Sequence, residues 1–150
     1  MTEPRPLGWK ELDTLAPPSA RVLVVEDDLG VRRGLERILA ALGYEVRSAG
    51  SAEEADHWLS AERFELMLLD IKLPRMKGVE FLSWALERDR ELAVVMLTGL
   101  DDPELAIQCL ELGARTYLVK PIETDFLRLA LRDALAVRRL LLERNARVGS

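Results

Sequence analysis

From residue 21 onward, short apolar runs alternate with longer amphipathic stretches, and the unit repeats five times. The apolar runs, which are strand candidates, cover residues 21–25, 45–49, 65–70, 92–98 and 115–120. The amphipathic stretches have helical length and cover about 29–42, 52–61, 78–89, 103–112 and 123–146. A repeated strand–helix unit predicts an α/β fold with a parallel sheet and right-handed crossovers. The Val- and Leu-rich strands do not alternate with polar residues, which indicates burial on both faces.

Local signals at the helix ends agree with this division. Residues 51–54, Ser-Ala-Glu-Glu, have the spacing of a capping box at a helix start. Asp102 followed by Pro103 predicts an N-cap and a first helical residue. Gly43 and Gly113 stand where helices should stop before a strand.

Four of the five predicted strands end in polar residues with useful chemistry. They are Glu26, Asp27 and Asp28 after the first strand, Asp70 after the third, Thr98 after the fourth and Lys120 after the fifth. In an open parallel sheet the carboxyl ends of the strands share one edge, and ligands bind there. These side chains are therefore expected to converge on one site.

The predicted set of side chains suits phosphoryl transfer. Clustered carboxylates favour a hard divalent cation such as Mg²⁺, which completes its shell with water and phosphate oxygens. A lysine and a hydroxyl supply donors for phosphate oxygens. A carboxylate can itself act as a nucleophile and form an acyl phosphate. Positioning and charge neutralisation are most of what such a transfer requires.

Residues 21 to about 137 resemble the receiver domain of bacterial two-component response regulators. Four motifs carry the resemblance, in this order: VVEDD, LLDIKLPRMKG, MLTG and YLVKP. The resemblance implies a doubly wound, flavodoxin-like five-stranded parallel sheet in the order 2-1-3-4-5. It also implies phosphorylation by a histidine kinase or phosphotransfer protein. Such a domain is a phosphoacceptor that assists its own phosphotransfer and dephosphorylation rather than a turnover enzyme.

The resemblance also assigns roles to individual residues. Asp70 would be the phosphoacceptor, and Glu26 and Asp27 would join it in holding Mg²⁺ or Mn²⁺. The remaining implied roles are a metal-binding backbone carbonyl at Lys72, phosphoryl contacts from Thr98 and Lys120, a cis bond between Lys120 and Pro121, and an aromatic switch at Tyr117.

Several of these positions have alternative interpretations. Asp28 could be a third metal ligand, but an N-cap for the following helix is favoured. Tyr117 could be a switch or ordinary core packing, and the sequence does not separate the two. Glu26 replaces a more usual Asp, and its longer side chain is expected to act through water. His57 lies in a charged helix and is expected at the surface.

Two other site classes fit poorly. A flavodoxin-type site needs a Ser-, Thr- and Gly-rich phosphate loop after the first strand, whereas residues 26–30 are EDDLG. A haloacid-dehalogenase-type phosphatase normally carries a second Asp two residues after its nucleophile, and Lys72 occupies that position.

The chain is expected to contain a flexible, Pro-containing leader (1–20), a receiver domain (21–137) and an extension of the last helix (138–150) that acts as a linker or dimerising tail. The receiver either stands alone or belongs to a longer regulator. A homodimer could form through the last helix or through the face made by residues 103–112, 115–120 and 123–146. An interaction module that works without phosphorylation is the alternative function.

Composition excludes some partners. The net charge of −5 gives no electrostatic footprint for nucleic acid. No apolar run reaches the roughly 18 residues that a membrane span needs, and the N-terminus lacks a signal-peptide core. The single cysteine, Cys109, cannot form an internal disulfide, which fits a reducing compartment. A cytoplasmic location is the simplest expectation.

Overall fold

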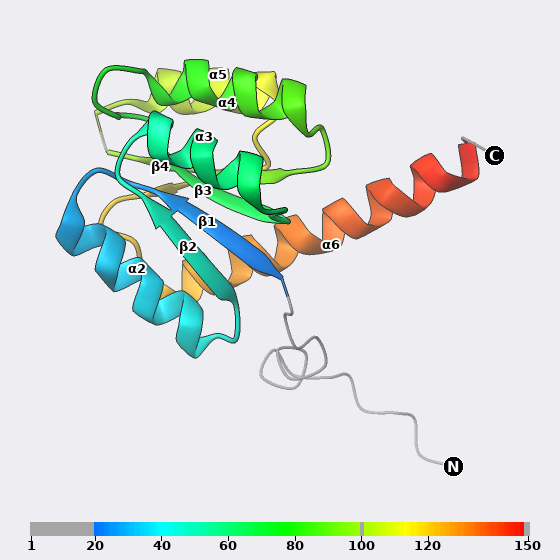
Figure 1. Ribbon diagram of the computed structural model, residues 1–150, viewed down its shortest axis with the longest axis horizontal. Coiled ribbons are helices and arrows are strands. Elements are labelled where there is room, and N and C mark those ends of the chain that lie inside the picture. Colours follow the sequence, from blue (N-terminus) through cyan, green and yellow to red (C-terminus); the bar gives the residue numbers. More distant parts are fainter. Residues whose placement is uncertain (1–19, 100, 149–150) are drawn as a thin grey trace, which may run out of the picture.

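The computed structural model describes residues 20–99 and 101–148. Five parallel strands form one sheet in the order β2-β1-β3-β4-β5, with helices on both faces (Figure 1). The strands are β1 (Arg21–Val25), β2 (Glu45–Ala49), β3 (Leu66–Asp70), β4 (Ala93–Thr98) and β5 (Thr116–Val119). The helices are α2 (Leu29–Ala41), α3 (Ala52–Ala61), α4 (Gly78–Arg88), α5 (Pro103–Leu112) and α6 (Thr124–Val148). The predicted fold class and strand order are confirmed. The predicted leader lies outside the described residues, apart from Ala20.

The hydrophobic core consists of two layers, one on each face of the sheet. Alternate residues of the central strands point to opposite layers: in β3, Met67 and Leu69 face α3, α4 and α5, whereas Leu66 and Leu68 face α2 and α6. All residues of β3 and β4 are buried, while the edge strands β2 and β5 are partly exposed. This burial on both faces explains why the central strands lack polar alternation.

The helix ends largely follow their sequence signals. Asp28 is the N-cap of α2, and its Oδ1 accepts a hydrogen bond from the Val31 amide at 3.0 Å. Ser51 Oγ accepts from the Glu54 amide at 3.2 Å, so the predicted cap of α3 is present. Gly113 ends α5 with a φ of 119°, a conformation that glycine adopts without steric cost.

Helix α6 differs along its length. Its first half packs on the sheet through Leu127, Leu131 and Ala134, which are buried. Arg138 Nε still donates to the Glu91 carbonyl at 2.9 Å. Beyond this contact the helix continues to Val148 and projects away from the rest of the domain (Figure 1). The predicted extended C-terminal helix is therefore present. In the described part of the chain, no helix has the length and apolar character to cross a membrane.

Candidate functional site

Three acidic side chains meet at the carboxyl edge of the sheet. Glu26 and Asp27 follow β1, and Asp70 is the last residue of β3, which is hydrogen-bonded to β1. One carboxylate oxygen from each of the three lies within 4.8 Å of the others. Glu26 and Asp70 are buried, whereas Asp27 is exposed. The sheet thus brings together the acids that the sequence predicted to converge.

Lys120 lies between the two buried acids. Its Nζ donates to Glu26 Oε1 and Oε2, both at 3.0 Å, and to Asp70 Oδ2 at 2.8 Å. The backbone amide of Lys120 donates to the Thr98 carbonyl at 2.8 Å, which fixes the lysine at the end of β5. The peptide bond between Lys120 and Pro121 is cis.

Burial and crowding change the acid–base properties of this group. Burial, together with the neighbouring Asp70, raises the pKa of Glu26 to about 8, although Lys120 opposes the shift. Burial alone would lower the pKa of Lys120, but its hydrogen bonds and charge interactions with Asp70 and Glu26 raise it overall. Lys120 thus stays protonated, while Glu26 takes up a proton more readily than an ordinary carboxyl.

The donor set fits a hard divalent cation. The three carboxylates and one ammonium give a formal balance of −2 when all are ionised (−3 + 1). The candidate ligand atoms of the three acids are carboxylate oxygens, the ligands that Mg²⁺ prefers. A dication would therefore neutralise the charge that burial makes unfavourable. Asp28 is used as a helix cap, which leaves Glu26, Asp27 and Asp70 as the acidic ligand candidates.

The loop after Asp70 packs closely against the start of α4. The Lys72 amide donates to Asp70 Oδ1 at 3.0 Å, so both carboxylate oxygens of Asp70 accept a hydrogen bond. The Gly78 amide donates to the Ile71 carbonyl at 2.8 Å. A Cβ at position 78 would lie 2.3 Å from the Asp70 carbonyl oxygen, too close for any side chain. Gly78 therefore permits the loop conformation that presents Asp70.

The remaining predicted residues lie at or near this edge. Thr98 is 2% exposed, and its hydroxyl donates to the Gly99 carbonyl at 3.1 Å, so contact with a ligand on Asp70 would require the hydroxyl to turn. Tyr117 lies on edge strand β5 and is 40% exposed. Tyr117 is therefore not an ordinary core residue, which was one of the two interpretations of this position. His57 is exposed, as predicted.

Sequence reasoning missed Arg32. Its Nη1 donates to the Glu26 carbonyl at 2.9 Å, and a Cβ on Gly50 would lie only 2.5 Å from the same nitrogen. Helix α2 thus holds the backbone of the acidic segment through a gap left by glycine. No local pattern marks this contact, because it depends on the packing of three separate segments.

The environment of Asp102 requires a correction. It occupies the N-cap position of α5, as predicted, but its side chain makes no capping hydrogen bond. Instead its Oδ2 pairs with Lys72 Nζ at 3.0 Å, and the same ammonium pairs with Asp101 Oδ2 at 3.0 Å. The Asp102 carboxylate, which the sequence predicted to cap α5, therefore pairs with Lys72, a residue distant in the sequence.

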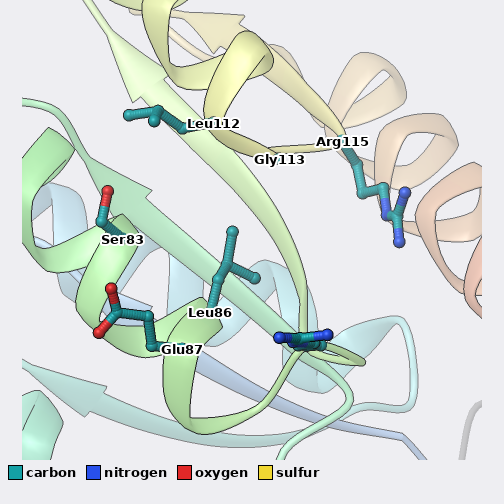
Figure 2. Close-up of a pocket in the computed structure, with 7 residues that line it drawn as sticks. Ser83, Leu86, Glu87, Leu112, Gly113 and Arg115 are labelled. Atoms are coloured by element: carbon teal, nitrogen blue, oxygen red, sulfur yellow. The ribbon is translucent and has the colours of Figure 1, made fainter.

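A hollow of about 500 Å³ lies away from this edge (Figure 2). It is lined by the C-terminal part of α4, the turn after it, the end of α5 and the segment before β5: Ser83, Leu86, Glu87, Arg90, Leu112, Gly113 and Arg115. Figure 2 shows the Arg115 side chain directed away from Ser83 and Leu86. None of the predicted site residues lines this hollow, so it is separate from the acidic site.

The sheet order and the acidic carboxyl edge define a flavodoxin-like α/β protein with a candidate cation site. Residues 22–132 match the family model of the response regulator receiver domain. The chain therefore belongs to the receiver domain family of response regulators, as the sequence motifs indicated.

Relatives and solved structures agree with this assignment. The chain is 35% identical over 123 residues to the C4-dicarboxylate transport transcriptional regulatory protein DctD of Pseudomonas aeruginosa, covering 82% of this chain and 27% of that protein. It is 36% identical over 115 residues to the probable transcriptional regulator ycf27 of Cyanophora paradoxa, covering 77% and 48%. It thus spans between about a quarter and a half of these curated relatives.

Among solved structures, a CheY-like receiver domain protein from Methanospirillum hungatei matches with a TM-score of 0.77 and 33% identity, covering 81% of this chain and 98% of that one. NtrX from Brucella abortus, solved in complex with ATP, matches with a TM-score of 0.82 and 32% identity, covering 85% of this chain and 29% of that one.

Proposed function

We propose that Asp70 accepts a phosphoryl group from a histidine kinase or phosphotransfer protein in a reaction that depends on Mg²⁺. The observation that carries this proposal is the arrangement around Asp70: two further acids within 4.8 Å and one lysine 2.8 Å from its carboxylate. A nucleophilic carboxylate, a place for a dication and a fixed ammonium are the parts that phosphoryl transfer to an acid requires.

In the proposed step, a carboxylate oxygen of Asp70 attacks phosphorus. The bond between phosphorus and the donor imidazole nitrogen breaks, and its electron pair stays on that nitrogen. Glu26, Asp27, Asp70 and the Lys72 carbonyl would hold Mg²⁺, which supplies charge neutralisation for the phosphoryl oxygens. Lys120 exchanges its hydrogen bond to Asp70 for one to a phosphoryl oxygen, and the Thr98 hydroxyl turns from the Gly99 carbonyl to donate to another.

The proposed output surface is the face formed by α5, β5 and α6. Large apolar side chains are exposed there, namely Ile107, Leu112, Tyr117, Val119, Phe126 and Leu129. Because β4 and β5 are adjacent, movement of Thr98 can reach Tyr117 through the strand pair. We assign Tyr117 as the switch residue, and this face as the surface that contacts a partner or a second copy in the cytoplasm.

Intact mass measurement tests the proposal. The chain is incubated with phosphoramidate and Mg²⁺, and the expected result is the gain of one phosphoryl group in the wild type. Asp70→Asn should gain none, because the amide replaces the nucleophilic oxygen. Omission of Mg²⁺ should also suppress the gain.

Asp133→Asn is the matched control, since Asp133 is an exposed aspartate of α6 remote from the acidic site. It should be phosphorylated like the wild type. An unchanged mass in the wild type, or an undiminished gain in Asp70→Asn, would contradict the role of Asp70.

The projecting half of α6 favours a second candidate function, a dimerising module that works without phosphorylation. Leu140 is 63% exposed on this half, and Val137, just before the Arg138 contact, is 40% exposed. Apolar groups on a projecting helix can pair with a second copy. Sedimentation of the wild type and Asp70→Asn, with and without phosphoramidate, separates the two functions. Equal dimerisation in all four samples would favour the alternative.

A further inference from the structure

A lysine beside the phosphoacceptor connects two loops of the site. Lys72 belongs to the loop after β3, and its Nζ lies 3.0 Å from Asp101 Oδ2 and 3.0 Å from Asp102 Oδ2, in the loop before α5. The side chains of Lys72 and Asp101 are 63% and 71% exposed, whereas that of Asp102 is 19% exposed. We refer to this group of three residues as the clasp.

The clasp lies within reach of Asp70. The backbone amide of Lys72 already donates to Asp70 Oδ1 at 3.0 Å, so the lysine is tethered directly beside the phosphoacceptor. At the other end, Asp102 follows β4 by four residues, and Thr98 is the last residue of that strand. The clasp therefore joins the loop of the proposed phosphoacceptor to the loop that follows its hydroxyl partner.

Asp102 has a second use for its carboxylate. It is the N-cap residue of α5, and Pro103 follows it at the first helical position. The first amides of a helix have no acceptor within the helix, and an aspartate at the N-cap normally supplies one to Glu104 or Leu105. Here the Asp102 side chain makes no such bond and faces Lys72. The carboxylate thus has two alternative partners, the ammonium and the helix start.

We propose that the clasp is a switch that links the charge on Asp70 to the start of α5. In the resting protein Lys72 holds Asp101 and Asp102, and α5 begins without a side-chain cap. A phosphoryl group on Asp70 offers three acceptor oxygens and draws the Lys72 ammonium toward itself. The released Asp102 then caps α5. This inference rests on the proposed phosphorylation of Asp70 and adds a route from that residue to the proposed output face.

The two arrangements of Asp102, paired with Lys72 or capping α5, are expected to be close in free energy, as a switch requires. The Lys72 ammonium is exposed, and water competes for it, so its pairs with Asp101 and with the partly buried Asp102 contribute little stability. An aspartate N-cap is a comparable or somewhat stronger interaction. Neither partner therefore holds Asp102 irreversibly, and one additional charge beside Lys72 is enough to change which arrangement is favoured. An ion pair with both charges buried would not exchange in this way.

The experiment follows the backbone amides of Glu104 and Leu105 by solution NMR, through their rates of exchange with water. In the wild type, phosphoramidate and Mg²⁺ should slow exchange at one of these amides by about fivefold, the effect of a side-chain N-cap. Lys72→Gln should show the slower exchange already without phosphodonor, because Asp102 is free to cap. Asp102→Ala should show the fast exchange in both conditions.

Lys77→Gln is the matched control, because Lys77 is an exposed lysine of the same loop that makes no side-chain cap to α4. It should behave like the wild type. Unchanged exchange in resting Lys72→Gln would overturn the clasp, and so would an equal response to phosphodonor in Lys72→Gln and the wild type.

Intact mass, taken on each sample, separates the two proposals. A wild type that gains no phosphoryl group would overturn the proposed function, while the resting comparison of wild type and Lys72→Gln would still decide whether Lys72 withholds Asp102 from α5. A phosphorylated wild type whose amides do not change would overturn the clasp alone.

Discussion

Two groups at the carboxyl edge of the sheet have the same composition, one lysine between two carboxylates, but differ in burial. Lys120 is 29% exposed, and its partners Glu26 and Asp70 are 1% and 6% exposed. In the clasp, Lys72 is 63% exposed and Asp101 71%, whereas Asp102 is 19% exposed. Both groups are held at 2.8–3.0 Å. The distances alone would predict equal contributions to stability from the two groups. Their exposure to solvent is what distinguishes them.

Burial determines what happens when one partner is lost. If an exposed pair is broken, water solvates the remaining charges, and little free energy changes. If a buried pair is broken, the remaining charge stays desolvated and unpaired, which is costly. The Lys120 group is therefore expected to fix the geometry of the site, whereas the clasp is expected to be exchangeable.

The largest predicted effect follows from Lys120→Met. This change leaves the buried Asp70 carboxylate without its counter-charge and removes the ammonium that opposes the raised pKa of Glu26, so the free energy of unfolding should fall by about 3 kcal/mol. Urea denaturation without Mg²⁺ measures the loss. Saturating Mg²⁺ should restore much of it, because a dication neutralises the same acids.

Lys120→Arg provides the control for charge, since it keeps the positive group while changing its shape. It should lose less stability than Lys120→Met. Equal losses in both variants would mean that packing of the lysine stem, and not the pairing of buried charges, accounts for the effect.

The next prediction concerns metal binding at the buried group. At a Mg²⁺ concentration of about 100 times the dissociation constant, the free energy of unfolding should rise by about 2.7 kcal/mol. Asp27→Asn removes one of the three acidic ligands. A loss of affinity of about a hundredfold would reduce the gain to about 0.4 kcal/mol at the same concentration. Thermal or urea unfolding with and without Mg²⁺ measures both values.

Asp101→Asn separates the two groups in the same measurement. It removes an acid that belongs to the exposed clasp and is not one of the three clustered acids. The increase in the free energy of unfolding on adding Mg²⁺ should be the same as in the wild type. If the stabilisation by Mg²⁺ disappeared in Asp101→Asn but persisted in Asp27→Asn, the metal would bind at the clasp and not at the three clustered acids.

The fold and the positions of the site residues could be predicted because both follow from local signals. The alternation of Val- and Leu-rich runs with amphipathic stretches placed all five strands within about one residue of their observed bounds. Once the sheet is parallel, Asp70 and Thr98 must lie at one edge, because each ends a strand. The Asp28 cap was likewise predictable, since its partner Val31 is only three residues away.

The contacts that tune the site could not be predicted. Arg32 reaches the Glu26 carbonyl over Gly50, and Lys72 takes the carboxylate of Asp102 from the helix that it was expected to cap. Each involves segments joined only by the folded sheet, and the sequence contains no periodic signal for them. The N-cap pattern at Asp102 correctly gave the start of α5 but not the direction of the side chain.

The smallest predicted effect concerns the clasp. The hydrogen bonds and charge of Lys72 hold the pKa of Asp101 below its usual value. Because the folded-state pKa is lower than the unfolded one, the contact stabilises the fold above the unfolded pKa of about 3.9 and is lost as pH falls through the folded value. In Lys72→Gln, NMR titration should show the pKa of Asp101 rising toward its usual value.

The same substitution should leave the urea midpoint at neutral pH unchanged, in contrast to the loss in Lys120→Met. Water replaces the ammonium at Asp101, which is 71% exposed, so the perturbed pKa does not translate into a comparable change in stability. Added salt should reduce the pKa shift of Asp101 in the wild type as well. A clear drop in the midpoint of Lys72→Gln would show that the clasp is held as firmly as the buried group, and the contrast between an exchangeable and a fixed lysine would then fail.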